Sequence, residues 1–85
     1  MGKLNEIPNI GKKLEEQLNN VGINDINQLK LIGSKKAWSM IKGIDESAWL
    51  NRLYALEGAI KNIRWHNLDD DTKRNLKEFK INYGK

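Results

Sequence analysis

Four glycines divide the first half of the chain at nearly equal intervals. Gly11, Gly22, Gly33 and Gly43 stand ten or eleven residues apart, which leaves room for about two to three helical turns between neighbours. A glycine just past the end of a helix readily adopts the left-handed backbone that a C-terminal cap requires. No stretch alternates apolar and polar residues for long enough to be a strand. The spacing therefore predicts a string of short helices and an all-α fold.

Capping residues and apolar spacing predict about five helices in a single compact domain, residues 1–85. Asn24, Ser34 and Asp45 have side chains that can accept hydrogen bonds from the first N–H groups of a helix, so each is a predicted N-cap. The predicted helices cover residues 12–20, 25–32, 35–42, 46–62 and 70–79.

The predicted helix 46–62 carries the broadest apolar face, with Trp49, Leu53 and Leu56 among its members. A helix with such a wide apolar face is packed by several others, so we expect it to be the longest and the central one. Gly58 lies inside it and costs about 1 kcal/mol relative to alanine. We therefore expect a second helix to cross closely at this glycine.

Three consecutive aspartates, Asp69, Asp70 and Asp71, stand at the predicted start of the last helix. The positive end of the helix dipole favours carboxylates there. A divalent metal needs further oxygen ligands that converge on the same point, and the sequence indicates none. We predict no metal site. Residues 4–80 are expected to be ordered, and the tail, 81–85, is expected to fray.

The charge balance permits a polyanionic partner but does not demand one. The 85 residues carry 15 Lys and Arg against 11 Asp and Glu, which gives a net charge of +4 and a pI near 9.4.

Cysteine is absent, which excludes disulfides, zinc ribbons and thiol catalysis. No apolar run approaches the length of a membrane span, and Met1 is not followed by the apolar core of a signal peptide. We expect a soluble, cytoplasmic protein.

No arrangement of residues supports an enzyme. His66 is the single histidine, and no glycine-rich loop has the spacing of a nucleotide-binding motif. A domain of this size is too small to cover a typical small-molecule pocket. We predict no catalytic residue and no cofactor, with His66 exposed beside a core residue, Trp65.

The segment Ile7-Pro8-Asn9-Ile10-Gly11-Lys12-Lys13 has the pattern of a helix-hairpin-helix loop, with at most one helical turn before it. Such a loop directs backbone N–H groups toward a phosphate, assisted by the dipole of the following helix. Asn9, Gly11, Lys12 and Lys13 are therefore candidate phosphate contacts. The alternative is a turn that pins Ile7 and Ile10 into the core and leaves the lysines solvated. The common motif has glycine where Asn9 stands.

A segment with part of the same sequence pattern precedes the third predicted helix. Ile32-Gly33-Ser34-Lys35-Lys36 again places Ile-Gly before a lysine pair, so Ser34, Lys35 and Lys36 are candidates for a second phosphate contact. Lysines in a first helical turn oppose the dipole, and an anion nearby would offset that repulsion. Base stacking needs exposed aromatic residues beside basic ones, and only Trp38 is near such an arrangement. We expect Trp38 and Trp49 to be core residues.

With these segments in place, the chain resembles the C-terminal domain of the TfoX competence regulators. The resemblance covers about residues 4–79, and its specific part is the Leu-Tyr-Ala-Leu-Glu-Gly-Ala-Ile block. Its blocks, in order, are Ile7 to Gly11, then Gly22 and Ile23 with Leu29, Ile32 and Gly33, and then Leu53 to Ile60 with Trp65, Asn67 and Leu68.

The resemblance implies a small helical domain of helix-hairpin-helix or SAM-like arrangement, linked to the regulation of natural transformation in bacteria. Larger members carry an additional N-terminal domain, so the chain is expected to be a stand-alone protein of the C-terminal type. Two functions stay open for such a domain. One is a module that binds the DNA backbone without reading sequence. The other is a SAM-like interaction domain that joins a regulatory protein or a second copy of itself.

Overall fold

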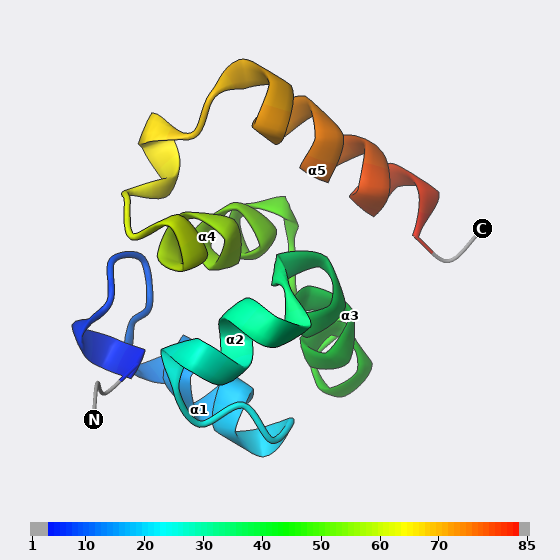
Figure 1. Cartoon of the computed structure of the whole chain (residues 1–85). Coiled ribbons are helices and arrows are strands. Elements are labelled where there is room, and N and C mark those ends of the chain that lie inside the picture. The colour runs from blue at the N-terminus through cyan, green and yellow to red at the C-terminus, as the bar shows by residue number, and fades with distance from the viewer. Residues whose placement is uncertain (1–3, 84–85) are drawn as a thin grey trace.

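Figure 1 shows the computed structural model of the chain, which describes residues 4–83. Helices make up every regular element of this range, so the all-α prediction with five helices is confirmed. The elements are the short 3-10 helix η1 (Leu4–Glu6), α1 (Lys12–Asn20), α2 (Ile26–Ile32), α3 (Ser34–Ile44), α4 (Leu50–Lys61), a second 3-10 helix η2 (Trp65–Asn67) and α5 (Asp70–Asn82).

Helix α4 is the centre of the molecule, as its apolar face predicts. It packs against α2, α3, η2 and α5, and it buries Leu53, Leu56 and Ala59 almost completely. Figure 1 shows α5 lying across one side of α4, with the first three helices on the other. The largest fully buried side chains of the core are Leu4, Leu18, Ile23, Leu29, Trp38, Ile41, Leu53 and Leu56.

The first three helices begin and end within one or two residues of the predicted bounds, and the differences lie at their caps. Helix α1 covers the predicted range. Helix α2 begins one residue later, because Asp25 rather than Asn24 is the N-cap: its Oδ1 accepts the Gln28 N–H at 2.9 Å. Helix α3 does not stop at Gly43 but continues to Ile44.

The start of α4 departs most from the prediction. Asp45 does not cap it, because the Asp45 carboxylate accepts hydrogen bonds from the backbone N–H and hydroxyl of Ser47. This local turn keeps the following residues out of the helix, which begins only at Leu50. Helix α4 is therefore shorter than predicted, and α5, with 13 residues against 12, is the longest of the described helices.

The Asp45 carboxylate also joins three elements. Its Oδ2 accepts hydrogen bonds from Arg52 Nη1 of α4 at 2.8 Å and from Gln17 Nε2 of α1 at 2.6 Å. Hydrogen bonds from Ser47, and then from Arg52, hold the pKa of Asp45 far below its ordinary value. The carboxylate thus stays ionised and fixes α1 against the start of α4.

Trp38 is in the core as predicted, whereas the prediction for Trp49 is wrong. Trp38 is 1% exposed, and its indole N–H donates to the Trp49 carbonyl at 3.2 Å. Trp49 stands just before the first residue of α4, outside the helical face that packs inward, and its side chain is 63% exposed.

The aspartates at the start of α5 take the structural role predicted for them. Asp69 is the N-cap, and its Oδ1 accepts the Thr72 N–H at 2.8 Å. Hydrogen bonds from the hydroxyl and backbone of Thr72 lower the Asp69 pKa. Within residues 4–83 no group of three acidic or histidine side chains has an arrangement that would hold a metal ion. The helix continues to Asn82, beyond the predicted onset of fraying at residue 81, and residues 84–85 lie outside the described range.

No helix among the described residues is both long enough and apolar enough to cross a membrane.

Gly58 does mark a close approach, but no helix crosses there. A Cβ atom at this position would lie 2.5 Å from Asn9 Nδ2, 2.8 Å from the Ile63 carbonyl oxygen and 3.1 Å from the Trp65 nitrogen. The neighbours are therefore the side chain of Asn9, the turn after α4 at Ile63 and the first residue of the short 3-10 helix η2, and no α-helix crosses at this glycine. Glycine is needed because these groups occupy the space of a side chain.

This crowding gives a test with a matched control. We expect Gly58→Ala to lower the free energy of unfolding by about 1–3 kcal/mol, since backbone must move to admit the methyl group. At Gly43, also within a helix, a Cβ would meet nothing within 4 Å. Gly43→Ala should therefore raise the free energy of unfolding by about 0.5–1 kcal/mol. Urea denaturation measures both, and a stabilising Gly58→Ala would contradict the packing described.

Candidate nucleic-acid interface

The N-terminal hairpin consists of η1, a tight turn through residues 7–11, and α1. Its frame is buried: Leu4 is 1% exposed and Ile10 is 4% exposed. The Ile7 N–H donates to the Leu4 carbonyl at 3.0 Å, and the Ile10 N–H donates to the Ile7 carbonyl at 3.2 Å. The short helical turn predicted before the loop is present, and Ile10 anchors the loop in the core. A phosphate-binding loop and a purely structural turn both require this anchoring of Ile10.

Asn9 holds this turn in place from within the protein. Its Nδ2 donates to the Ile63 carbonyl at 2.8 Å, and its Oδ1 accepts the Trp65 N–H at 3.0 Å. Its backbone has a φ of 74°, the left-handed conformation in which glycine is common and asparagine is tolerated. Asn9 therefore takes the backbone role of the usual glycine. Its amide is occupied inside the molecule, so it positions the turn and does not point at a ligand.

Helix α1 begins at an exposed position without a side-chain cap. Gly11 is its N-cap residue and makes no side-chain hydrogen bond to the helix. The Glu15 N–H donates to the Gly11 carbonyl at 3.0 Å, so the N–H groups of residues 12–14 precede the intrahelical ladder. Lys12 and Lys13 are both exposed at this end. The structure thus brings Gly11, Lys12 and Lys13 together, with backbone donors and two cations at one helix start.

The second predicted phosphate contact is built differently. Gly33 has a φ of 88°, whereas Gly11 has an extended φ of −86°, so the two Ile-Gly segments are not equivalent. Ser34 is 5% exposed and its hydroxyl donates to Glu57 Oε1 at 2.6 Å. The prediction that Ser34 caps α3 is wrong: the hydroxyl turns inward to a carboxylate, which also pairs with Lys61 at 3.3 Å.

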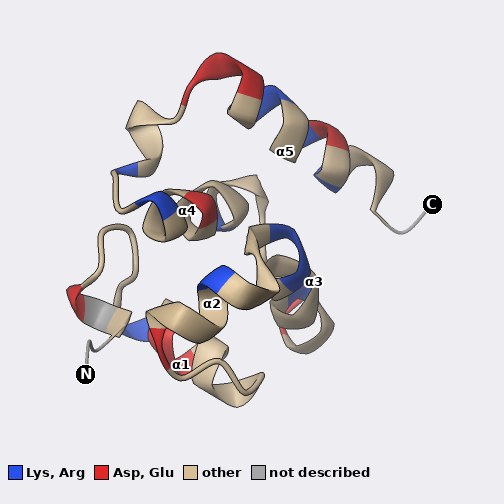
Figure 2. Cartoon of the chain, in the orientation of Figure 1, with Lys and Arg blue, Asp and Glu red and all other residues tan. Residues whose placement is uncertain are grey.

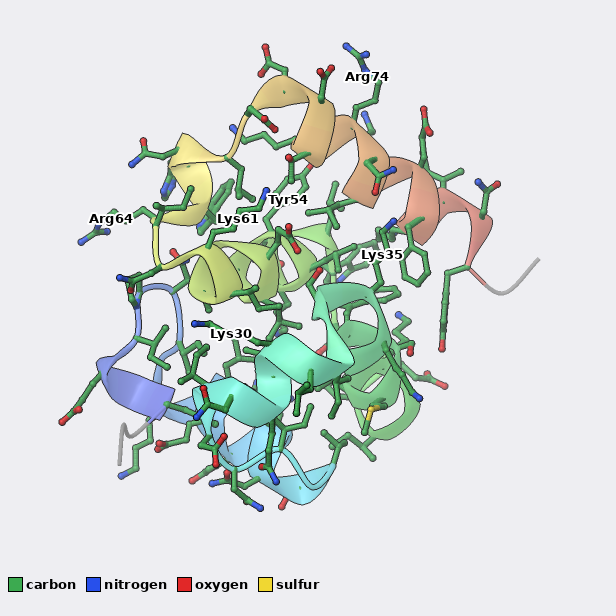
Figure 3. The ribbon with its side chains drawn as sticks, viewed as in Figure 1. Lys30, Lys35, Tyr54, Lys61, Arg64 and Arg74 are labelled. Carbon is green, nitrogen blue, oxygen red and sulfur yellow. The ribbon has the colours of Figure 1, made fainter. Side chains whose placement is uncertain are left out.

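Lys35 and Lys36 stand at the rim of an open pocket of about 640 Å³ between the start of α3 and α5. Glu57 and Asp71 line the same pocket, and their carboxylates oppose the entry of an anion. The Lys35 ammonium lies 5.7 Å from the centroid of the Phe79 ring, and Figure 3 shows this lysine between α3 and α5. The two lysine pairs therefore differ in their surroundings, and the start of α1 is the more open to an anion.

Lys30 is a basic residue that no pattern in the sequence singles out. It is exposed on α2. Figure 2 shows a basic position on α2 between the basic segments that open α1 and α3, and Figure 3 labels it as Lys30. Its neighbours in the sequence are Leu29 and Leu31, so a scan for adjacent lysines passes over it.

Comparisons with known proteins agree with this fold. The family model described as the TfoX C-terminal domain matches residues 1–80. Protein Sxy of Escherichia coli strain K12 is 34% identical over 58 residues, which cover 68% of this chain and 28% of that protein. The chain thus spans little more than a quarter of this relative.

Two crystal structures from Listeria monocytogenes are similar in fold and sequence. A triclinic form of an uncharacterized protein has a TM-score of 0.90 and 49% identity, with 92% of this chain and 89% of that chain covered. A tetragonal form of a protein of unknown function has a TM-score of 0.88 and 49% identity, covering 91% of this chain and 94% of that chain.

The two roles of Asn9 can be separated by substitution. Asn9→Gly keeps the positive φ but removes both side-chain hydrogen bonds, so it should lower the free energy of unfolding by about 1–3 kcal/mol. Asn9→Ala should cost about 1–2 kcal/mol more, because alanine is strained in the left-handed region. Urea denaturation of both variants measures the difference. An Asn9→Gly variant as stable as the parent would show that the side chain does not hold the turn.

Proposed function

This chain belongs to the TfoX C-terminal domain family, and we propose that it is a regulatory binding module that contacts the DNA backbone without reading base sequence. The start of α1 is the principal contact. There Gly11, Lys12 and Lys13 meet one phosphate, while Asn9 holds the turn behind them. Contacts to phosphate set affinity and orientation, and they carry no direct information about bases.

The single observation that carries this proposal is the uncapped, lysine-bearing start of α1. Helices α2 and α5 begin with aspartates that satisfy a first-turn N–H group, whereas α1, α3 and α4 begin without a side-chain cap. Of these three starts, only that of α1 opens with two exposed lysines. Free N–H groups and the helix dipole favour an anion at this point. Lys12 and Lys13 are unfavourable beside that dipole, and Glu15 is the one acidic residue of the first turn. A bound phosphate would add a second negative charge beside the two lysines.

The other basic residues have a secondary place in the proposal. Lys36 and Lys30 are exposed and can meet neighbouring phosphates of the same duplex. Ser34 is withdrawn from direct contact, because its hydroxyl is buried against Glu57. Within the pocket beside it, Glu57 and Asp71 disfavour phosphate, so contacts from this side would come from lysine side chains at the rim.

The family has no known catalytic activity, and we propose a non-enzymatic role for this chain. Its relation to Protein Sxy and to the TfoX family suggests a part in the regulation of competence or transcription. Because the chain spans 28% of Protein Sxy, the activity of that whole protein is not transferred to it.

A second candidate function is a SAM-like interaction domain that joins a regulatory protein. It is favoured by apolar side chains left exposed on two helices: Leu31 is 87% exposed on α2, and Ile44 is 55% exposed at the end of α3. Under this alternative, neutral substitutions of the lysine pairs would change partner binding little.

The proposal is tested by the salt dependence of binding to a labelled DNA duplex, followed by fluorescence anisotropy. We expect Lys12→Gln with Lys13→Gln to weaken binding to all duplex sequences similarly. The slope of log affinity against log salt should fall by about 0.9 for each phosphate that the variant no longer neutralises.

The matched control is Arg74→Gln with Lys77→Gln, which removes the same charge from exposed positions of α5. This control should keep most of the affinity and of the salt slope. Equal reductions in affinity in the two double variants would mean that only net charge matters. That result, or no duplex binding at low salt, would overturn the role proposed for the start of α1.

A further inference from the structure

A group of aromatic side chains surrounds the buried Trp38, and part of it faces solvent. The Trp38 ring centroid lies 5.0 Å from that of Tyr83 and 6.0 Å from that of Phe79. Trp49 joins the group through its carbonyl, which accepts the Trp38 indole N–H. Trp49 is 63% exposed and Tyr83 is 41% exposed. The Tyr83 ring thus packs against the buried Trp38 ring, the Trp49 backbone is joined to Trp38 by a hydrogen bond, and both side chains reach the surface.

Lysines from α3 and α5 lie over these aromatic rings. The Lys80 ammonium is 4.9 Å from the Trp49 centroid, and the Lys42 ammonium is 5.9 Å from it. Lys35 lies over Phe79, and both line a second open pocket of about 530 Å³ together with Tyr83 and one carboxylate, that of Glu78. We name the surface formed by Trp49, Phe79, Tyr83, Lys35, Lys42 and Lys80 the aromatic–lysine strip.

We propose that the aromatic–lysine strip binds single-stranded nucleic acid, with bases stacked on Trp49 and Tyr83 and lysines on the flanking phosphates. This deepens the proposed function, on which it rests only for the class of partner, a polynucleotide. Exposed aromatic rings interleaved with cations are the arrangement by which proteins bind single strands without sequence preference. Duplex DNA hides its base faces, so the strip and the start of α1 would serve different forms of the polymer.

The charge of the strip decides against other occupants. A protein partner would use the aromatic residues as anchors, but lysine is depleted from the centres of protein–protein interfaces. In a symmetric dimer the same patch meets itself. The lysines of both copies would then lie in one interface, and their like charges would oppose association. A flexible single strand offers bases that can stack on the rings and phosphates that can pair with the lysines.

The lysines do not block stacking, because they are held weakly. An exposed cation–π contact contributes less than the usual gain from stacking a base on an aromatic residue. A base that displaces Lys80 from the Trp49 ring leaves its ammonium free to meet the adjacent phosphate. Lys42 also donates to the carbonyl of Glu46, so its ammonium is held close to the same ring by a second contact.

The test compares a labelled oligothymidylate with a labelled duplex by fluorescence anisotropy at fixed salt. Trp49→Ala should weaken binding of the oligothymidylate by about 5- to 100-fold, the reduction typical of removing one stacking platform. It should leave duplex affinity unchanged within about twofold. Because the Trp49 carbonyl remains in this variant, the hydrogen bond to Trp38 is kept, and circular dichroism confirms the fold.

Three further variants make the result specific. Trp49→Phe should restore much of the single-strand affinity, since it keeps a stacking face. Leu31→Ala, which removes an exposed apolar side chain from α2, should have no effect on single-strand binding. Lys42→Gln with Lys80→Gln should weaken the salt-dependent part of binding while the ring remains.

Each remaining outcome decides the question. Oligothymidylate binding that is equal in the parent and Trp49→Ala would overturn the proposal, as would polyglutamate competing as well as an oligothymidylate of equal charge. Loss of single-strand binding in Trp49→Ala would support it even if no duplex binds. Duplex binding that depends on Lys12 and Lys13 without any single-strand binding would overturn the strip and leave the start of α1 as the only contact.

Discussion

Asn9 joins two parts of the chain that are far apart in the sequence. Its amide donates to the carbonyl of Ile63 and accepts the N–H of Trp65, which are 54 and 56 residues away. The space for this contact exists because Gly58 lacks a side chain. The turn that precedes α1 is thereby fixed to the segment that follows the central helix, as Figure 1 shows, and the start of α1 is held in one orientation. An anion site made of backbone N–H groups depends on such fixing, because donors on a mobile loop must be ordered again by each ligand.

Local patterns predicted the parts of this fold that local physics controls. Glycine spacing placed α1 correctly, and the apolar face identified α4 as the central helix. The aspartates before α5 act as predicted because N-capping involves neighbours only three residues apart. Asp45 shows the limit of that reasoning. An aspartate before an apolar run is as suitable for a turn as for a cap, and its contacts with Ser47, Arg52 and Gln17 select the turn.

The candidate site shows the same limit, because the roles of its residues depend on distant partners. The two Ile-Gly-lysine segments look alike in sequence, yet Ser34 faces Glu57 and Gly11 faces solvent. Trp49 differs from its prediction in the opposite direction to Ser34: it is predicted to be buried and is exposed. Trp49 carries an apolar side chain at helical spacing, but the late start of α4 leaves it outside the packed face, where Lys42 and Lys80 approach it. The sequence therefore identified Lys12 and Lys13 as candidates, whereas it wrongly assigned Trp49 to the core.

The central claim is that a phosphate binds at the start of α1, and amide chemical shifts of the labelled protein test it most directly. A short DNA duplex is added at low salt and then at higher salt. We predict that the largest chemical-shift changes fall on the N–H groups of residues 11–14 and become smaller as the salt concentration rises. The amide shift of Ser34 should change little. Shifts that are absent at low salt, or that centre on Ser34 and its pocket instead, would contradict it.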